Sequence, residues 1–101
     1  MRTEQGIAAL CAMIDKEQAE RYAREYPSVT PPKAHSHMGR RWVRVDVGQS
    51  GSYMIDEDGT IYGIKAYGVP HLGHRYGTLD TIAEWDWSEY NAALRKDRVS
   101  A

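Results

Sequence analysis

The stretch SYMIDEDGTIYGIKAY, residues 52–67, decides the fold class of this chain. Its two halves, SYMID and TIYGIKAY, place side chains alternately on opposite sides with a period of two, which is typical of β-strands. Between them, EDG at 57–59 is a turn signal, because Asp-Gly suits turns that need a positive φ. The stretch therefore predicts a β-hairpin.

A further strand is predicted directly before this hairpin. RRWVRVDV at 40–47 alternates apolar and polar side chains, and GQSG at 48–51 supplies a turn into the hairpin. The three strands predict an antiparallel meander. The face expected to form the core carries Val43, Val45, Val47, Tyr53, Ile55, Tyr62, Ile64 and Ala66. The opposite face is expected to carry Trp42, Arg44, Met54, Lys65 and Tyr67.

A helix and a linker are expected on the N-terminal side of the meander. Residues 3–26 carry apolar or aromatic side chains at helical spacing from Ile7 to Tyr22. Pro27 disfavours helical geometry at the residue before it, so the helix is expected to end there. Three of the four prolines fall within 27–37, which predicts an extended linker.

The C-terminal third returns to helical character. After a glycine-rich loop at 68–77, the segment 78–96 shows capping residues, with Ser88 as the N-cap of a second helix. One or two helices are therefore expected to pack on one sheet face, giving a single α+β domain. Its predicted parts are a helix at 1–26, a Pro-rich linker at 27–37, and a sheet with C-terminal helices at 38–101.

Composition narrows the function classes. Hydrophobic residues make up 42% and charged residues 27%, as in ordinary soluble proteins. The formal net charge of -1 argues against a general polyanion binder. A single cysteine, Cys11, fits a reducing compartment, and its place on the apolar helix face predicts a core thiol. Without a long apolar stretch or a signal-peptide pattern, we expect a cytoplasmic protein with no membrane association.

The aromatic and basic face of the meander is the first candidate site. Rings beside cations can stack on the bases of single-stranded nucleic acid while the cations meet phosphates. The same residue types dominate the hot spots of protein–protein interfaces. Alternatively, the Pro-rich linker covers these rings. The slightly acidic net charge favours a protein partner over nucleic acid.

Histidines give two weaker candidates. His35 with His37, and His71 with His74, form two close pairs that could bind zinc if all four converged. Both pairs lie in predicted loops without a supporting cysteine, so we expect no metal. The second pair, near Lys65, could also supply acid–base chemistry, as in a metal-independent ribonuclease. Because no catalytic motif fixes such a geometry, we expect neither enzymatic activity nor a cofactor.

One block also resembles known proteins. SGSYMIDEDGTIYGIKAYGVPHLGHRYGTLDT at 50–81 resembles a segment of small, mostly uncharacterised proteins of tailed bacteriophages and prophages. The matching parts are YMIDEDGTIYGIKAYG and GHRYGTLDT. The resemblance implies a phage or mobile element in a bacterial cytoplasm, and it implies no catalytic residues. Small accessory proteins in that setting, such as anti-CRISPR proteins, often bind and block a host machine.

The expected function follows from this resemblance and from the aromatic-basic face. We expect a phage-type accessory protein that acts by stoichiometric binding and inhibits a bacterial defence complex, in the manner of an anti-CRISPR protein. Its partner would be a bacterial host protein or ribonucleoprotein complex. A nucleic-acid-binding module and a small metal-independent nuclease or toxin are the alternatives. The expected binding surface comprises Trp42, Arg44, Lys65, Tyr67, His71, His74, Arg75 and Tyr76.

Overall fold

The computed structural model describes residues 2–89 and 91–95. One α-helix, α1 (Glu4–Glu25), precedes five strands that form one sheet. The strands are β1 (Ala34–Met38), β2 (Val43–Val47), β3 (Ser50–Ile55), β4 (Thr60–Ala66) and β5 (Val69–Thr78). The chain then forms a 3-10 helix, η1 (Leu79–Glu84), and two short strands, β6 (Trp85–Asp86) and β7 (Ala93–Leu94).

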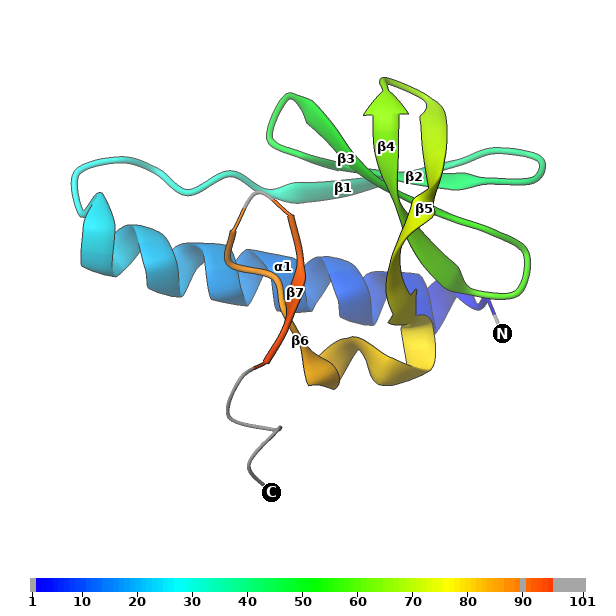
Figure 1. Ribbon diagram of the computed structural model, residues 1–101. Coiled ribbons are helices and arrows are strands. Elements are labelled where there is room, and N and C mark those ends of the chain that lie inside the picture. The colour runs from blue at the N-terminus through cyan, green and yellow to red at the C-terminus, as the bar shows by residue number, and fades with distance from the viewer. Residues whose placement is uncertain (1, 90, 96–101) are drawn as a thin grey trace.

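The five strands follow one another in the sheet in chain order, and every neighbouring pair is antiparallel. Figure 1 shows α1 running along one side of this sheet, with η1 and the small β6–β7 sheet on that side as well. The architecture is therefore α+β, with one face of the large sheet covered and the other left open. No helix in the described part of the chain is long and apolar enough to cross a membrane.

Local sequence explains the limits of α1. Gly6 N donates a hydrogen bond to Thr3 Oγ1 at 2.9 Å, so Thr3 caps the first turn. Pro27 follows the C-cap residue, where helical geometry is disfavoured. The helix at the N-terminus is thus confirmed. Burial, with the charge of Asp15, raises the pKa of the Cys11 thiol, which packs against the core.

The core lies between α1 and the inner face of the large sheet. Along the sheet it contains Val43, Val45, Tyr53, Ile55 and Ile61, which are all buried. The helix contributes Ile7, Leu10 and Ile14, and the segments after β5 contribute Leu79, Trp87 and Ala92. Burial of these apolar side chains supplies the main driving force for folding.

The predicted fold class is wrong in its sheet. The sheet has five strands rather than three, because residues 34–38 form β1 and residues 69–78 form β5. AHSHM carries no apolar alternation, since β1 is an edge strand whose side chains are mostly exposed. In β5, Pro70 and Gly73 are residues typical of loops, so the sequence gives no strand signal there. Register shifts between β4 and β5 accommodate these residues in the sheet.

The predicted C-terminal helices are also wrong. In the described residues after β5, η1 is the helix, and Trp85–Asp86 pairs with Ala93–Leu94 as a two-stranded sheet. Ser88 does not cap a helix; its hydroxyl and its backbone N–H both donate to Asp86 Oδ1. Tyr90 and the end of the predicted segment, 96–101, lie outside the described residues.

The face assigned to the third predicted strand needs a correction as well. Ile55 pairs with Ile61 and Met54 pairs with Tyr62 across the β3–β4 hairpin. Directly opposed residues share a face, so Ile61 enters the core while Tyr62 turns to the other side. The side chains of β4 therefore face the opposite way from the expectation, by one residue. The alternation within a strand does not by itself fix the register of a hairpin.

Polar side chains of α1 fix the segment after β6 in place. Glu17 Oε1 accepts a 2.7 Å hydrogen bond from Trp87 N, and Glu17 Oε2 pairs with Arg95. Gln18 Nε2 donates to the Trp87 carbonyl at 3.0 Å. Arg21 Nη1 donates to the Ser88 carbonyl at 3.1 Å. These bonds replace the backbone partners that a helix would have provided there.

Asp86 makes the stability of this segment depend on pH. The Ser88 hydroxyl donates to Asp86 Oδ1 at 2.6 Å and holds the pKa of the carboxyl below its ordinary value of 3.8. A depressed folded-state pKa stabilises the fold above the unfolded-state pKa, and this stabilisation is lost as pH falls through the folded-state pKa. We expect Asp86→Asn to cost about 1 kcal/mol at neutral pH and progressively less below pH ~4.

Urea unfolding of both proteins across this pH range measures the difference. A stability gap that stays constant into acid would show that the charge of Asp86 contributes nothing.

Candidate functional site

The face of the large sheet opposite α1, here called the outer face, is the candidate binding site. One row of directly opposed residues crosses all five strands: His37 on β1, Arg44 on β2, Met54 on β3, Tyr62 on β4 and Arg75 on β5. Directly opposed residues point to the same side of an antiparallel sheet. In this row Met54 and Tyr62 are buried, so the groups it presents at the surface are two guanidinium groups and an imidazole.

Cations and rings are paired along this face. The Arg44 guanidinium carbon lies 4.9 Å from the centroid of the Tyr67 ring, and that of Arg75 lies 5.7 Å from the Tyr62 ring. Trp42 meets Tyr62 edge-on, with 5.5 Å between centroids. Such contacts hold the guanidinium groups over the rings and leave their hydrogen-bond donors free for a partner.

A buried carboxylate positions the ring of Tyr67. Asp46 Oδ2 accepts a 3.0 Å hydrogen bond from the Tyr67 hydroxyl and lies 3.2 Å from His37 Nε2. Asp46 stands at a register shift between β2 and β3, where strands often re-aim side chains at functional sites. Gly51 on β3 makes room, since a Cβ there would lie 2.8 Å from the Tyr67 ring.

Arginines gather along the row and at the β1–β2 turn, while Asp56, Glu57 and Asp58 lie beside Trp42 at the β3–β4 turn. Arg40 and Arg41 in the β1–β2 turn add to the charges of the row, beside a depression of about 460 Å³ that reaches Trp42. Asp46 contacts the Tyr67 hydroxyl and His37 Nε2. Asp56 at the β3–β4 turn accepts from two backbone N–H groups and from the Tyr62 hydroxyl. A partner with carboxylates opposite the arginines would find complementary charge there.

Half of the predicted site residues come together here. Trp42, Arg44, Tyr67 and Arg75 lie on the outer face in mutual or shared contact. Lys65 is exposed beside a register shift between β4 and β5, and no contact ties it to the row.

The remaining predicted residues lie elsewhere on β5. His71 and His74 stack in parallel with their ring centroids 3.9 Å apart. Tyr76 is a core residue that packs edge-on against Tyr53 and Trp85, and burial raises the pKa of its phenol. Tyr76 therefore lies on the core side of the sheet rather than on the outer face.

The four histidines do not converge. The pair at His35 and His37 lies on β1 and the pair at His71 and His74 lies on β5, at opposite edges of the sheet. Within residues 2–89 and 91–95, no group of three or more histidine, cysteine or carboxylate side chains is placed to hold a metal ion.

Sequence reasoning missed two residues of the outer face and the role of a third. His37 was assigned to a linker, because β1 has no apolar alternation. Tyr62 was assigned to the core, one residue out of phase. The alternation of RRWVRVDV places Asp46 on the side of Trp42 and Arg44, but it does not show that Asp46 binds the Tyr67 hydroxyl.

Comparisons with known proteins add no information about this site. Comparison with protein-family models, with curated proteins and with solved structures finds no match to the chain.

Proposed function

We propose that this protein acts by stoichiometric binding of a partner protein through its outer face. The observation that supports this function best is the row of opposed residues across all five strands, in which Arg44 and Arg75 lie over the rings of Tyr67 and Tyr62. Arg, Tyr, Trp and Met are enriched at protein–protein interfaces, and Arg, Tyr and Trp among their hot spots. The guanidinium groups of Arg44 and Arg75 favour a partner that places carboxylates opposite them.

The geometry of the rings favours a protein partner over single-stranded nucleic acid. Base stacking needs exposed ring faces. Tyr62 is buried beneath Arg75 and the edge of Trp42, and Arg44 lies over the ring of Tyr67. The groups left for a partner are the guanidinium donors, the exposed part of Tyr67 and the half-buried Trp42, and the donors suit carboxylates.

The proposed biological setting comes from the phage-type block at 50–81, which contains β3, β4 and β5. In that setting the partner is a component of a bacterial defence complex, a protein or a ribonucleoprotein, and the protein inhibits it by occupying a working surface. Such an inhibitor needs no turnover, since one bound copy per target is sufficient.

A tagged pull-down from a nuclease-treated bacterial lysate, followed by mass spectrometry and titration of the purified partner, tests this function. We expect one dominant protein that survives nuclease and saturates near one equivalent. The variant Arg44→Glu/Arg75→Glu should no longer capture this partner. Arg24→Glu, at an exposed position on α1, should still capture it. Loss of all partners after nuclease, or an effect far below one equivalent, would contradict stoichiometric protein binding.

A further inference from the structure

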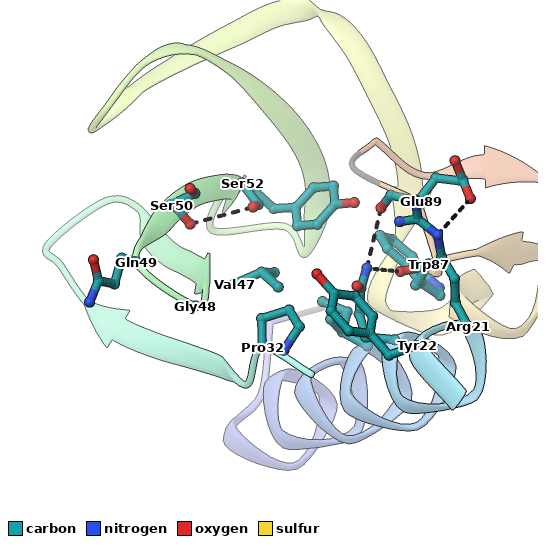
Figure 2. A pocket seen from close by; sticks show the side chains of 13 residues that line it. Arg21, Tyr22, Pro32, Val47, Gly48, Gln49, Ser50, Ser52, Trp87 and Glu89 are labelled. Atoms are coloured by element: carbon teal, nitrogen blue, oxygen red, sulfur yellow. Dashed lines mark hydrogen bonds and ion pairs between the residues drawn. The ribbon is translucent and has the colours of Figure 1, made fainter. Parts of the chain in front are cut away.

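Charged side chains are paired with one another in the cavity on the covered side of the sheet. This cavity of about 320 Å³ lies between the C-terminal half of α1, the segment before β1, the β2–β3 hairpin and the segment after β6 (Figure 2). Arg21 Nε lies 3.3 Å from Glu89 Oε2, and Figure 2 draws this contact as a dashed line. The charges at one end of the large sheet are arranged differently.

Two turns leave the large sheet at that end. Val43, the first residue of β2, pairs with Ile55, the last residue of β3. The β1–β2 turn, residues 39–42, and the β3–β4 turn, residues 56–59, therefore lie at the same end of the sheet, as Figure 1 also shows. The two turns carry opposite charges.

The β1–β2 turn borders the depression of about 460 Å³ described above. None of the described residues that line this depression carries a carboxylate; the lining residues with cationic or titratable nitrogen groups are His37, Arg40, Arg41 and Arg44. Arg40 and Arg41 are exposed, and their guanidinium groups have no hydrogen-bond or ion-pair partner within residues 2–89 and 91–95. Met38, which is 64% exposed, adds apolar surface to the same depression.

The β3–β4 turn borders a second depression, of about 230 Å³, that contains Asp56, Glu57 and Asp58 together with Arg41 and Trp42. Asp56 is held within the turn, because its Oδ1 accepts from two backbone N–H groups. Glu57 and Asp58 are exposed, and no described residue pairs with their carboxylates. Unpaired acidic groups thus lie beside unpaired basic groups.

The half-buried Trp42 lines both depressions and separates them. Two complementary patches side by side make a surface that fits a second copy of itself. A two-fold axis between them places the acidic patch of each copy on the basic patch of the other, so that every contact forms twice. Trp42 then lies near the axis, and tryptophan is among the residues most enriched in interface hot spots.

From this arrangement we infer that the protein forms a two-fold symmetric dimer through these two turns. Glu57 and Asp58 of each copy lie against Arg40 and Arg41 of the other. Exposed ion pairs contribute little affinity, so these charges mainly set the orientation, while Trp42 supplies apolar contact area. We expect a weak dimer, with Kd of about 100 µM.

The dimer interface overlaps one end of the outer face, because it includes Trp42 and the depression that Arg44 lines. Dimerisation therefore competes with the proposed partner for that end of the outer face. The inference itself does not rest on the proposed function, since its test needs only the isolated protein.

Sedimentation equilibrium from about 10 µM to about 1 mM protein, in about 0.15 M salt, tests the dimer. The mean mass of the wild type should rise from 11.5 kDa toward twice that value. Arg40→Glu/Arg41→Glu and Glu57→Lys/Asp58→Lys should each remain monomeric, because each places like charges opposite one another. An equimolar mixture of the two variants should dimerise with Kd within about tenfold of wild type, since opposite charges again meet at both contacts.

The four altered side chains are exposed, so both variants should fold, and thermal unfolding checks this. Lys16→Glu/Arg24→Glu, at exposed positions on α1, makes the same change in net charge as the arginine variant and should dimerise like wild type. A wild type that stays monomeric at about 1 mM would overturn the inference. So would undiminished dimerisation of either turn variant, a mixture that stays monomeric, or an equal loss in the α1 variant.

Discussion

Trp87→Ala is expected to lower the free energy of unfolding by about 3–5 kcal/mol, the largest effect of any single substitution considered. Trp87 is completely buried, and its ring packs against Tyr53. Its backbone N–H is bound by Glu17 and its carbonyl by Gln18, so loss of the indole also loosens the contact between α1 and the C-terminal segment. Urea-induced unfolding, with both the midpoint and the m-value, measures the loss.

Trp42→Ala is the matched control, because Trp42 is a half-buried tryptophan on the outer face. We expect it to cost less than half as much stability as Trp87→Ala. Equal losses in the two variants would mean that the segment after β6 is not part of the core.

The double variant Arg44→Glu/Arg75→Glu is expected to weaken partner binding by about 3 kcal/mol, roughly a hundredfold in Kd. Both guanidinium groups lie over rings of the outer face, and reversal of their charge places carboxylates against an acidic partner. Equilibrium titration of the captured partner measures the change, with thermal unfolding to show that the variant is folded.

Arg24→Glu is the control for this experiment, since it reverses one exposed arginine on α1, on the covered side of the sheet, with half the change in net charge of the double variant. It should leave the affinity within about twofold of wild type. If Arg24→Glu weakened binding as much as the outer-face variant does, net charge rather than the outer face would determine affinity.

The parts of the fold that could be predicted from sequence are those where one local signal dominates. The helix before Pro27 and the strands that contain Val43, Val45 and Ile55 follow from apolar periodicity, because each buries one face. The Asp-Gly turn at 58–59 was also recognised, and Gly59 has the positive φ of 89° that such a turn needs.

The parts that could not be predicted depend on tertiary partners. β1 is a strand because β2 pairs with it, and its exposed polar side chains give no pattern of their own. The segment after η1 has helical spacing in sequence, but Trp87 enters the core and α1 side chains take its backbone hydrogen bonds. Tertiary contacts of this kind override local propensity.

The candidate site was predictable in composition but not in arrangement. Strand parity brought Trp42 and Arg44 to one face from sequence alone. The place of Tyr62 depended on hairpin register, and the contact of Tyr67 with Asp46 depended on a register shift between β2 and β3. The cavity between α1, the segment before β1, the β2–β3 hairpin and the segment after β6 had no sequence signal, because its walls come from these four separate segments.

Site-specific photo-crosslinking tests most directly the claim that the outer face binds the partner. Benzoylphenylalanine would replace Tyr67, which is 57% exposed on the outer face, or Tyr26, which is 44% exposed at the end of α1. We expect a covalent adduct with the captured partner from position 67 and none from position 26. An adduct from position 26 with none from position 67 would contradict the assignment of the binding site.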